Sequence, residues 1–287
     1  MSIVVQYGSS ARGDLDSLSD YDLLIVGRCP QYVQGNPKYD IAKYSKNRLR
    51  NLCKNNSLFL IHLREEGKII EDNDNWMENF LSNVPDFIPN ESSLRLSKKN
   101  LSIAVSLQPT KKLMPCWYDM IFVFLRDYLV KLNALSKKYV FSVENLLNFL
   151  SIEYKYELAI ILKICREIKY RYRNGIKQNI FINPIWAANI IKKALHIESN
   201  EYSLDELINK KNNFDQYLIL RLIEYKAIEG SIRTSRNIKK YIKKPSLYSW
   251  NIRNIEWINE IEIVERINSD DEKELRGAGE VSYLAHA

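Results

Sequence analysis

The chain has 287 residues, 46% of them hydrophobic and 27% charged, which is enough for one large folded domain or two modest ones. Its formal net charge of +7 favours polyanionic partners such as nucleic acid or nucleotides, although a generally lysine-rich surface gives the same balance. The cysteines form no CxxC pair and the histidines are isolated, which argues against a zinc site and a disulfide framework. No signal peptide or membrane-spanning run is recognisable, so we expect a cytoplasmic protein without membrane contact.

The first part of the chain alternates predicted strands and helices, the pattern of a small sheet covered by helices. A helix is expected after the Gly8-Ser9 turn, and Ser45 is the expected N-cap of a further helix. The segments "SLFLIHL" and "KIIED" flank "REEG" and are predicted to form a hairpin. The remaining strands are predicted at residues 3–7, 22–26 and 38–44.

The rest of the chain reads as mostly helical, because apolar residues recur there at helical spacing. Helices are predicted within residues 116–135, 154–174, 214–229 and 251–267, with Gly175 and Gly230 as stop signals. We therefore predict an α+β protein, in which a small mixed-sheet domain is followed by a mostly α-helical bundle. The expected divisions are a first domain at 1–75, a connecting region at 76–115, a helical domain at 116–268 and a disordered tail at 269–287.

The stretch "YGSSARGDLDSLSDYDLLIVG", residues 7–27, crowds aspartates into an otherwise basic chain. Asp20 and Asp22 lie two positions apart at the start of a predicted strand, so their carboxylates face the same side. Like charges in this arrangement repel unless a cation lies between them, and hard carboxylate oxygens suit Mg²⁺ or Mn²⁺. Asp14 and Asp16 fit ordinary helix caps or turn residues equally well.

The Gly8-Ser9 turn before these aspartates has the features of a phosphate site. Gly8 allows close approach to the backbone, the Ser9 hydroxyl can donate to a phosphate oxygen, and Arg12 can add a charge-assisted contact. The free N–H groups at the start of the predicted helix add to this anion affinity. The stretch does not fit an EF-hand loop, a Walker loop or the G-x-S-x-G elbow of hydrolases.

These residues resemble the signature of the DNA polymerase beta-type nucleotidyltransferase superfamily: Gly-Ser, often Arg-Gly, then Ser-Asp-x-Asp-Leu at a set distance. The matching positions include Gly8, Ser9, Arg12, Asp20 and Asp22, and the resemblance covers roughly residues 3–72. It implies two bound metal ions, with Asp20 and Asp22 as ligands and a third carboxylate on a neighbouring strand. Asp40, in "KYDIAKYS", is the candidate for this third ligand and for the base that takes the acceptor proton.

The implied activity is metal-dependent transfer of a nucleoside monophosphate from an NTP to a hydroxyl acceptor, with the Gly8-Ser9 turn holding the leaving pyrophosphate. Segments 166–178 and 233–254 mix basic and aromatic residues, which suits an RNA acceptor such as a tRNA end but also fits a solvated basic face. Small relatives in toxin–antitoxin and defence systems make a partner protein the other macromolecular candidate. Alternatives are a small-molecule, aminoglycoside-like acceptor, a cyclic-oligonucleotide synthase and a non-catalytic module that binds nucleotide or RNA.

Overall fold

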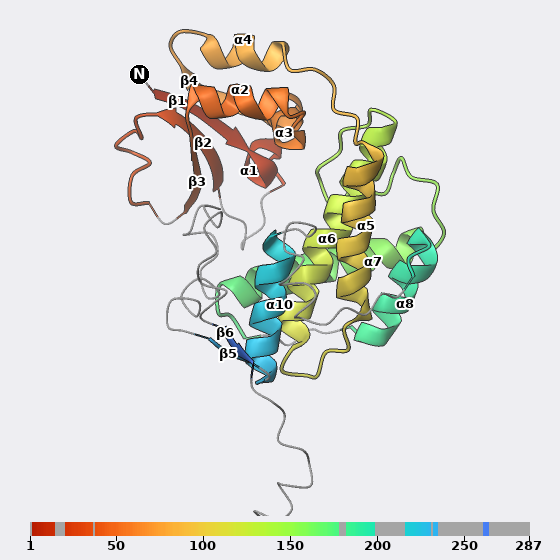
Figure 1. Ribbon diagram of the computed structural model, residues 1–287. Helices are drawn as coiled ribbons and strands as arrows, with labels where there is room; N and C mark the ends of the chain where they lie inside the picture. The colour runs from red at the N-terminus through yellow and green to blue at the C-terminus, as the bar shows by residue number, and fades with distance from the viewer. Residues whose placement is uncertain are drawn as a thin grey trace, which may run out of the picture.

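A computed structural model shows a small mixed sheet with its helices, followed in the chain by a group of longer helices (Figure 1). The first part holds β1–β4 and α1–α4, and the second holds α5–α8 and α10. This arrangement confirms the predicted α+β class. The structure describes residues 2–14, 21–36, 38–177, 182–198, 216–230, 232–234 and 261–263.

The sheet has the strand order β3-β2-β1-β4. β1 runs antiparallel to both of its neighbours, whereas β2 and β3 run parallel to each other. The strands predicted at residues 3–7, 22–26 and 38–44 are confirmed. Their observed bounds, with that of the last strand, are Ser2–Tyr7 for β1, Tyr21–Gly27 for β2, Tyr39–Tyr44 for β3 and Lys68–Asp72 for β4.

The two faces of the sheet are covered differently. On one face Val5 and Leu24 join the main core, where α2 (Lys46–Lys54) and α3 (Leu58–Glu66) pack (Figure 1). On the other face Leu23 and Ile25 pack with Val4 and with Val33 from the loop that follows β2. Because side chains alternate along a strand, the residues of β2 with even numbers face the helices.

The predicted hairpin around "REEG" is wrong, because its first half forms a helix. The buried residues Leu60, Ile61 and Leu63 of α3 lie on one helical face that packs on the sheet, and a short apolar run fits either structure. β4 therefore pairs with β1 rather than with residues 57–63. Gly67 joins α3 to β4, and any Cβ at this position would collide with the carbonyl oxygen of Leu63.

Side-chain caps fix the ends of the helices around the sheet. The predicted N-cap Ser45 is confirmed, since its Oγ accepts from the backbone N–H of Arg48 at 3.1 Å. At the end of β4, the Asp72 carboxylate accepts from the backbone N–H groups that begin α4 (Trp76–Ser82), including that of Met77 at 2.6 Å. This carboxylate thereby satisfies amides that would otherwise lack a partner.

The helical part is built around α6 (Met114–Leu135), which packs against α5, α7 and α10 and has Trp117 fully buried (Figure 1). The other bounds are Glu91–Ser106 for α5, Lys155–Arg173 for α7, Pro184–Leu195 for α8 and Gln216–Glu229 for α10. Gly175 and Gly230 follow α7 and α10 with positive φ, as the sequence predicts. Among the described helices, none is long and apolar enough to cross a membrane.

One further prediction fails near the C-terminal end. A helix was expected over residues 251–267, but Ile261–Ile263 forms a strand, β6, paired with β5 (Ile232–Thr234). The sequence Ile-Glu-Ile alternates apolar and polar residues with period two, and its two isoleucines are β-branched, which favours a strand locally. The other residues of that predicted helix and the predicted tail at 269–287 lie outside the described residues.

Candidate functional site

The two described aspartates that the sequence singled out lie next to each other in the sheet. Asp22 of β2 is in register with Asp40 of β3, and on its other side Asp22 is paired with Tyr7 of β1. Directly opposed residues point to the same face, and neighbouring strands are only about 5 Å apart. Tyr7, Asp22 and Asp40 therefore form one row across the sheet. Asp20 lies outside the described residues.

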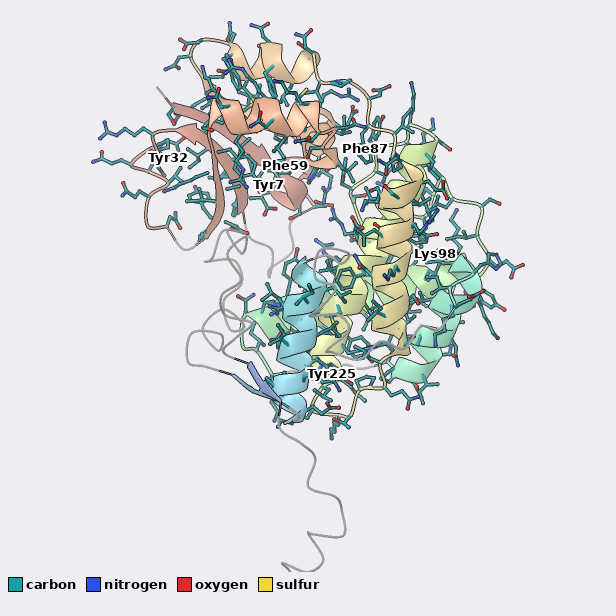
Figure 2. All side chains as sticks on the ribbon, in the orientation of Figure 1. Tyr7, Tyr32, Phe59, Phe87, Lys98 and Tyr225 are labelled. Atoms are coloured by element: carbon teal, nitrogen blue, oxygen red, sulfur yellow. The ribbon has the colours of Figure 1, made fainter. Side chains whose placement is uncertain are left out.

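The pKa of the Tyr7 hydroxyl is affected by the other members of this row. Its pKa is raised above the ordinary value by burial first, and then by the charges of Asp22 and Asp40. Its ring packs edge-on against Phe59 of α3, at a centroid distance of 5.4 Å (Figure 2). The row is thus a partly buried, electronegative place beside the helices, where a cation is favoured.

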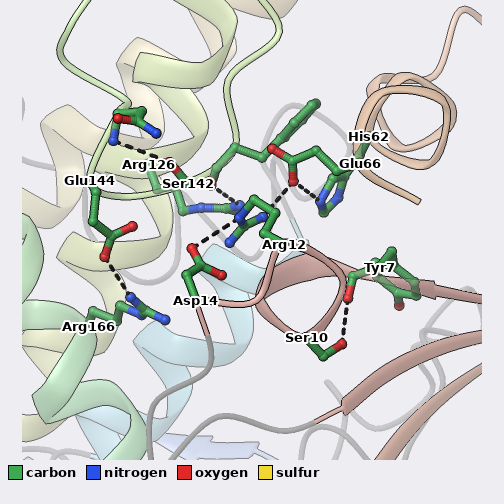
Figure 3. Close-up of polar contacts among 12 residues, drawn as sticks. Tyr7, Ser10, Arg12, Asp14, His62, Glu66, Arg126, Ser142, Glu144 and Arg166 are labelled. Carbon is green, nitrogen blue, oxygen red and sulfur yellow. Dashed lines mark hydrogen bonds and ion pairs between the residues drawn. The ribbon is translucent and has the colours of Figure 1, made fainter. Parts of the chain in front are cut away.

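The Gly8 turn lies close to the carboxylate of Asp22. α1 (Gly8–Arg12) begins directly after β1, and Gly8 adopts a positive φ of 71°. A Cβ on this residue would collide with Oδ2 of Asp22. Ser9 is buried, and the Ser10 hydroxyl donates to the carbonyl oxygen of Tyr7 at 3.0 Å (Figure 3). The predicted phosphate turn and the predicted metal ligand Asp22 therefore adjoin each other.

Arg12 is held by carboxylates. Its Nη1 donates to Glu66 Oε2 at 2.5 Å, and its Nε donates to Asp14 Oδ2 at 3.1 Å (Figure 3). Burial lowers the pKa of Arg12, but Glu66 and Asp14 outweigh it and raise the pKa above the ordinary value. The sequence predicts Arg12 as a phosphate ligand; in the structure its guanidinium joins the end of α1 to the end of α3.

The same cluster connects the sheet to the helical part. His62 Nε2 lies 3.1 Å from Glu66 Oε2, and the His62 ring stacks on Phe141 at 4.3 Å. Phe141 lies in the connection between α6 and α7, and its carbonyl oxygen accepts from Arg126 Nη2 at 2.9 Å. Sequence reasoning missed this cluster, because no local pattern relates residues so far apart in the chain.

The residues present fit a divalent cation. Asp22 and Asp40 offer hard carboxylate oxygens from adjacent strands, and their charges add to the burial that raises the pKa of Tyr7. Among the described residues, no group of three or more His, Cys, Asp or Glu side chains is close enough to hold a metal ion. A complete ligand set therefore needs a donor beyond Asp22 and Asp40, and the position of Asp20 two residues before Asp22 suits this role.

Comparison with known protein families agrees with this geometry. Residues 3–105 match the family model of the nucleotidyltransferase domain, a match that runs from β1 to the end of α5. The chain therefore carries a nucleotidyltransferase domain of the polymerase beta-type superfamily, and the resemblance seen in the sequence is confirmed. The match to this family supports the transfer of a nucleoside monophosphate as the general activity of the domain. No curated protein matches the chain.

Proposed function

We propose that this protein is a divalent-metal-dependent enzyme that transfers a nucleoside monophosphate from an NTP to a hydroxyl group. The observation that carries the proposal is the row in which Asp22 and Asp40 are in register beside Gly8, within a nucleotidyltransferase domain. Two carboxylates that face one point next to a glycine turn suit the joint binding of a metal ion and a polyphosphate.

Each residue of this site has a defined task in the proposed reaction. Asp20, Asp22 and Asp40 would hold Mg²⁺ or Mn²⁺, which would supply Lewis-acid stabilisation of the charge on the phosphoryl oxygens. Asp40 accepts the proton of the acceptor hydroxyl. The acceptor oxygen forms a bond to the α-phosphorus, and the bond between this phosphorus and the pyrophosphate oxygen breaks. The Gly8-Ser9 turn lies beside the leaving pyrophosphate.

We favour a macromolecular acceptor, an RNA such as tRNA or a partner protein, over a cationic small molecule. The support is that Lys169 of the helical part lies within electrostatic reach of Asp22 and of a second cation, Arg126, so that an aminoglycoside-like cation would meet like charges there. The basic-aromatic segment at 166–178 agrees only in part with RNA stacking, because the Tyr172 hydroxyl is turned inward and donates to Glu224 at 2.6 Å. A toxin–antitoxin setting remains an expectation from the resemblance, and a cytoplasmic location remains an expectation from the cysteine usage and the other sequence features.

A transfer assay with an NTP radiolabelled at the α-phosphorus tests the proposal. The protein is incubated with Mg²⁺ and total tRNA, total cell protein or no acceptor. We expect label on one acceptor, and a loss of about 100-fold or more in Asp22→Asn and Asp40→Asn. Asp86→Asn is the matched control, because Asp86 is an exposed carboxylate paired with Arg64 and Lys137.

Each other outcome of this assay indicates a different function or a different active site. Label found only in nucleotide products indicates a cyclic-oligonucleotide synthase. Metal-dependent NTP binding without transfer to any acceptor indicates a binding module and contradicts the enzyme. Equal transfer by wild type and Asp22→Asn contradicts the assigned site.

A further inference from the structure

Two cations of the helical part, Arg126 and Lys169, lie within electrostatic reach of residues of the sheet domain. Arg126 comes from α6 and Lys169 from α7, and these two helices pack along each other (Figure 1). Arg126 points toward Arg12 (Figure 3). Lys169 lies within electrostatic reach of both Arg126 and Asp22. The two side chains thus stand where the helical part meets the aspartate row.

The neighbouring arginines are neutralised by carboxylates. Arg12 is bound to Glu66 at 2.5 Å, and Arg166 Nη1 lies 3.1 Å from Glu144 Oε1. Arg173 is paired with the fully buried Asp119. These contacts are what a folded protein ordinarily provides for a guanidinium that is removed from water.

Arg126 and Lys169 have no such counter-ion among the residues that the structure describes. The printed contact of Arg126 is a neutral carbonyl, that of Phe141 at 2.9 Å. The Lys169 Nζ lies over the rings of Phe122 and Tyr170, at 5.1 Å and 5.4 Å from their centroids. Both side chains are half-buried, so water compensates their charges only in part.

The pKa of each of these two cations is lowered, because burial outweighs the carboxylates that oppose it. Burial lowers the pKa of Arg126, and the charge of Arg12 lowers it further. Burial lowers the pKa of Lys169, which Asp119 opposes more strongly than Asp22 does, while Arg126 acts in the same direction as burial. Two adjacent cations in this condition are stabilised by an anion that binds between them.

We propose that Arg126 and Lys169 together bind a phosphate group that is brought to the Asp22 site. A guanidinium and an ammonium that lack a carboxylate partner match the oxygens of a phosphate, and both residues are held by the helical part rather than by the sheet. The proposal rests on the proposed function for the assignment of the Asp22 site. The phosphate belongs either to the NTP or to a nucleic-acid acceptor, which have the same chemistry.

Binding measurements with two probes test the pair. The full chain is titrated calorimetrically with inorganic tripolyphosphate, and separately with a single-stranded RNA that ends in a 3′ hydroxyl and lacks a 5′ phosphate. We expect Lys169→Met and Arg126→Met to bind one probe about 10- to 100-fold more weakly, as the loss of a charge-assisted contact predicts. Lys131→Met is the matched control, since this cation of α6 is paired with Asp127 at 2.9 Å, and its affinities should stay unchanged.

The pattern of losses identifies the source of the phosphate. Weaker tripolyphosphate binding with unchanged RNA binding assigns the pair to the NTP, and the reverse assigns it to the acceptor. Unchanged binding of both probes by both variants, or no binding of either probe by the wild-type protein, overturns the proposal.

A second readout separates this proposal from a purely structural role. Without ligand, Lys169→Met removes an uncompensated half-buried charge and should raise Tm, whereas Lys169→Arg should keep both the charge and the binding. A fall in Tm in Lys169→Met together with unchanged binding makes Lys169 structural and contradicts the pair. If the wild-type protein binds tripolyphosphate through the pair but transfers no nucleotide, the phosphate site stands and the proposed function fails.

Discussion

The backbone of Gly8 lies so close to the carboxylate of Asp22 that a side chain at residue 8 would have to displace this carboxylate. Gly8 also adopts a positive φ of 71°, which L side chains rarely take. Position 8 thus favours glycine for two separate reasons, the close approach to Asp22 and the positive φ. Only the close approach involves the aspartate row. Gly35 shares only the positive φ. Its φ is 76°, and a Cβ at this position would meet nothing within 4 Å.

Gly8→Ala should therefore lose far more activity than stability. The new methyl group would displace the Asp22 carboxylate, and we expect nucleotidyl transfer to fall by about 100-fold, as displacements of this size do in active sites. Gly35→Ala carries the same backbone strain of about 1 kcal/mol without the collision, and its activity should match that of the wild type. Transfer rates and chemical denaturation of the two variants provide the measurement. Equal activity in both variants would contradict the close approach of Gly8 to Asp22.

Divalent cations should stabilise the protein through the aspartate row. Binding of Mg²⁺ to the folded state alone raises the free energy of unfolding by about 1.4 kcal/mol when the ion is present at roughly tenfold its Kd. Thermal denaturation with and without Mg²⁺ measures this gain, which should vanish in Asp22→Asn and Asp40→Asn and persist in Asp86→Asn. An equal gain in all of these proteins would mean that the metal binds elsewhere.

The buried pair of Asp119 and Arg173 should be the most sensitive ionic contact of the helical part. Asp119 on α6 is fully buried, and Arg173 of α7 and the Tyr217 hydroxyl of α10 donate to it. Asp119→Ala leaves Arg173 without this partner and should lower the free energy of unfolding by about 3–5 kcal/mol. Tyr217→Phe removes one hydrogen bond and should lower it by about 1 kcal/mol. Urea denaturation distinguishes these values. Similar losses of free energy of unfolding in the two variants would show that the ion pair is not the main contribution of Asp119 to stability.

Acidification should weaken the contact between the sheet and the helical part. Burial raises the pKa of Glu66, but hydrogen bonds from His62 and Arg12 outweigh burial and lower the pKa below its ordinary value. The stabilisation by Glu66 is therefore complete above about pH 4.5, its unfolded value, and is lost as the pH falls through the lower folded value. Glu66→Gln should be less stable at pH 7 by about 1–3 kcal/mol, and its stability should change less than that of the wild type as the pH falls through this range below 4.5.

His62 adds to the acid sensitivity of the same contact. Burial lowers the pKa of His62, so the neutral ring is the form that stacks on Phe141. Its contribution is complete above the unfolded value of about 6.5 and is lost toward lower pH. Stability measured by denaturation from pH 8 to about pH 2 tests both residues. A profile that is the same in wild type and Glu66→Gln would contradict the assigned network.

The cysteines should differ in reactivity. Cys116 and Cys165 are buried, and burial raises the pKa of both thiols. Cys29 and Cys53 are only half-buried. A thiol reagent added to the native protein should modify Cys29 and Cys53 first, and Cys116 and Cys165 only after denaturation. Mass spectrometry of the modified protein identifies the sites, and early modification of Cys165 would contradict the packing of α7.

Local signals in the sequence were sufficient to predict an element where the pattern fits only one type of secondary structure. The strands at 3–7 and 22–26 are short apolar runs that lead into glycine turns. The Ser45 side chain is a local signal for the start of a helix, because it caps the first turn of α2. The apolar run at 57–63 had two solutions, because its side chains fit a strand as well as the helix face that covers the sheet. Packing against the sheet decided between them.

For the functional site, the sequence by itself supplied the motif: a glycine turn followed by closely spaced aspartates, whose resemblance to a known signature implies a nucleotidyltransferase domain. Only the tertiary structure decided which side chains meet. It set Asp40 in register with Asp22, engaged Arg12 with Glu66, and brought Arg126 and Lys169 from separate helices toward the aspartate row. The physical reason is that residue type and spacing fix charge and local geometry, whereas contacts between distant segments arise only when the sheet and the helices pack.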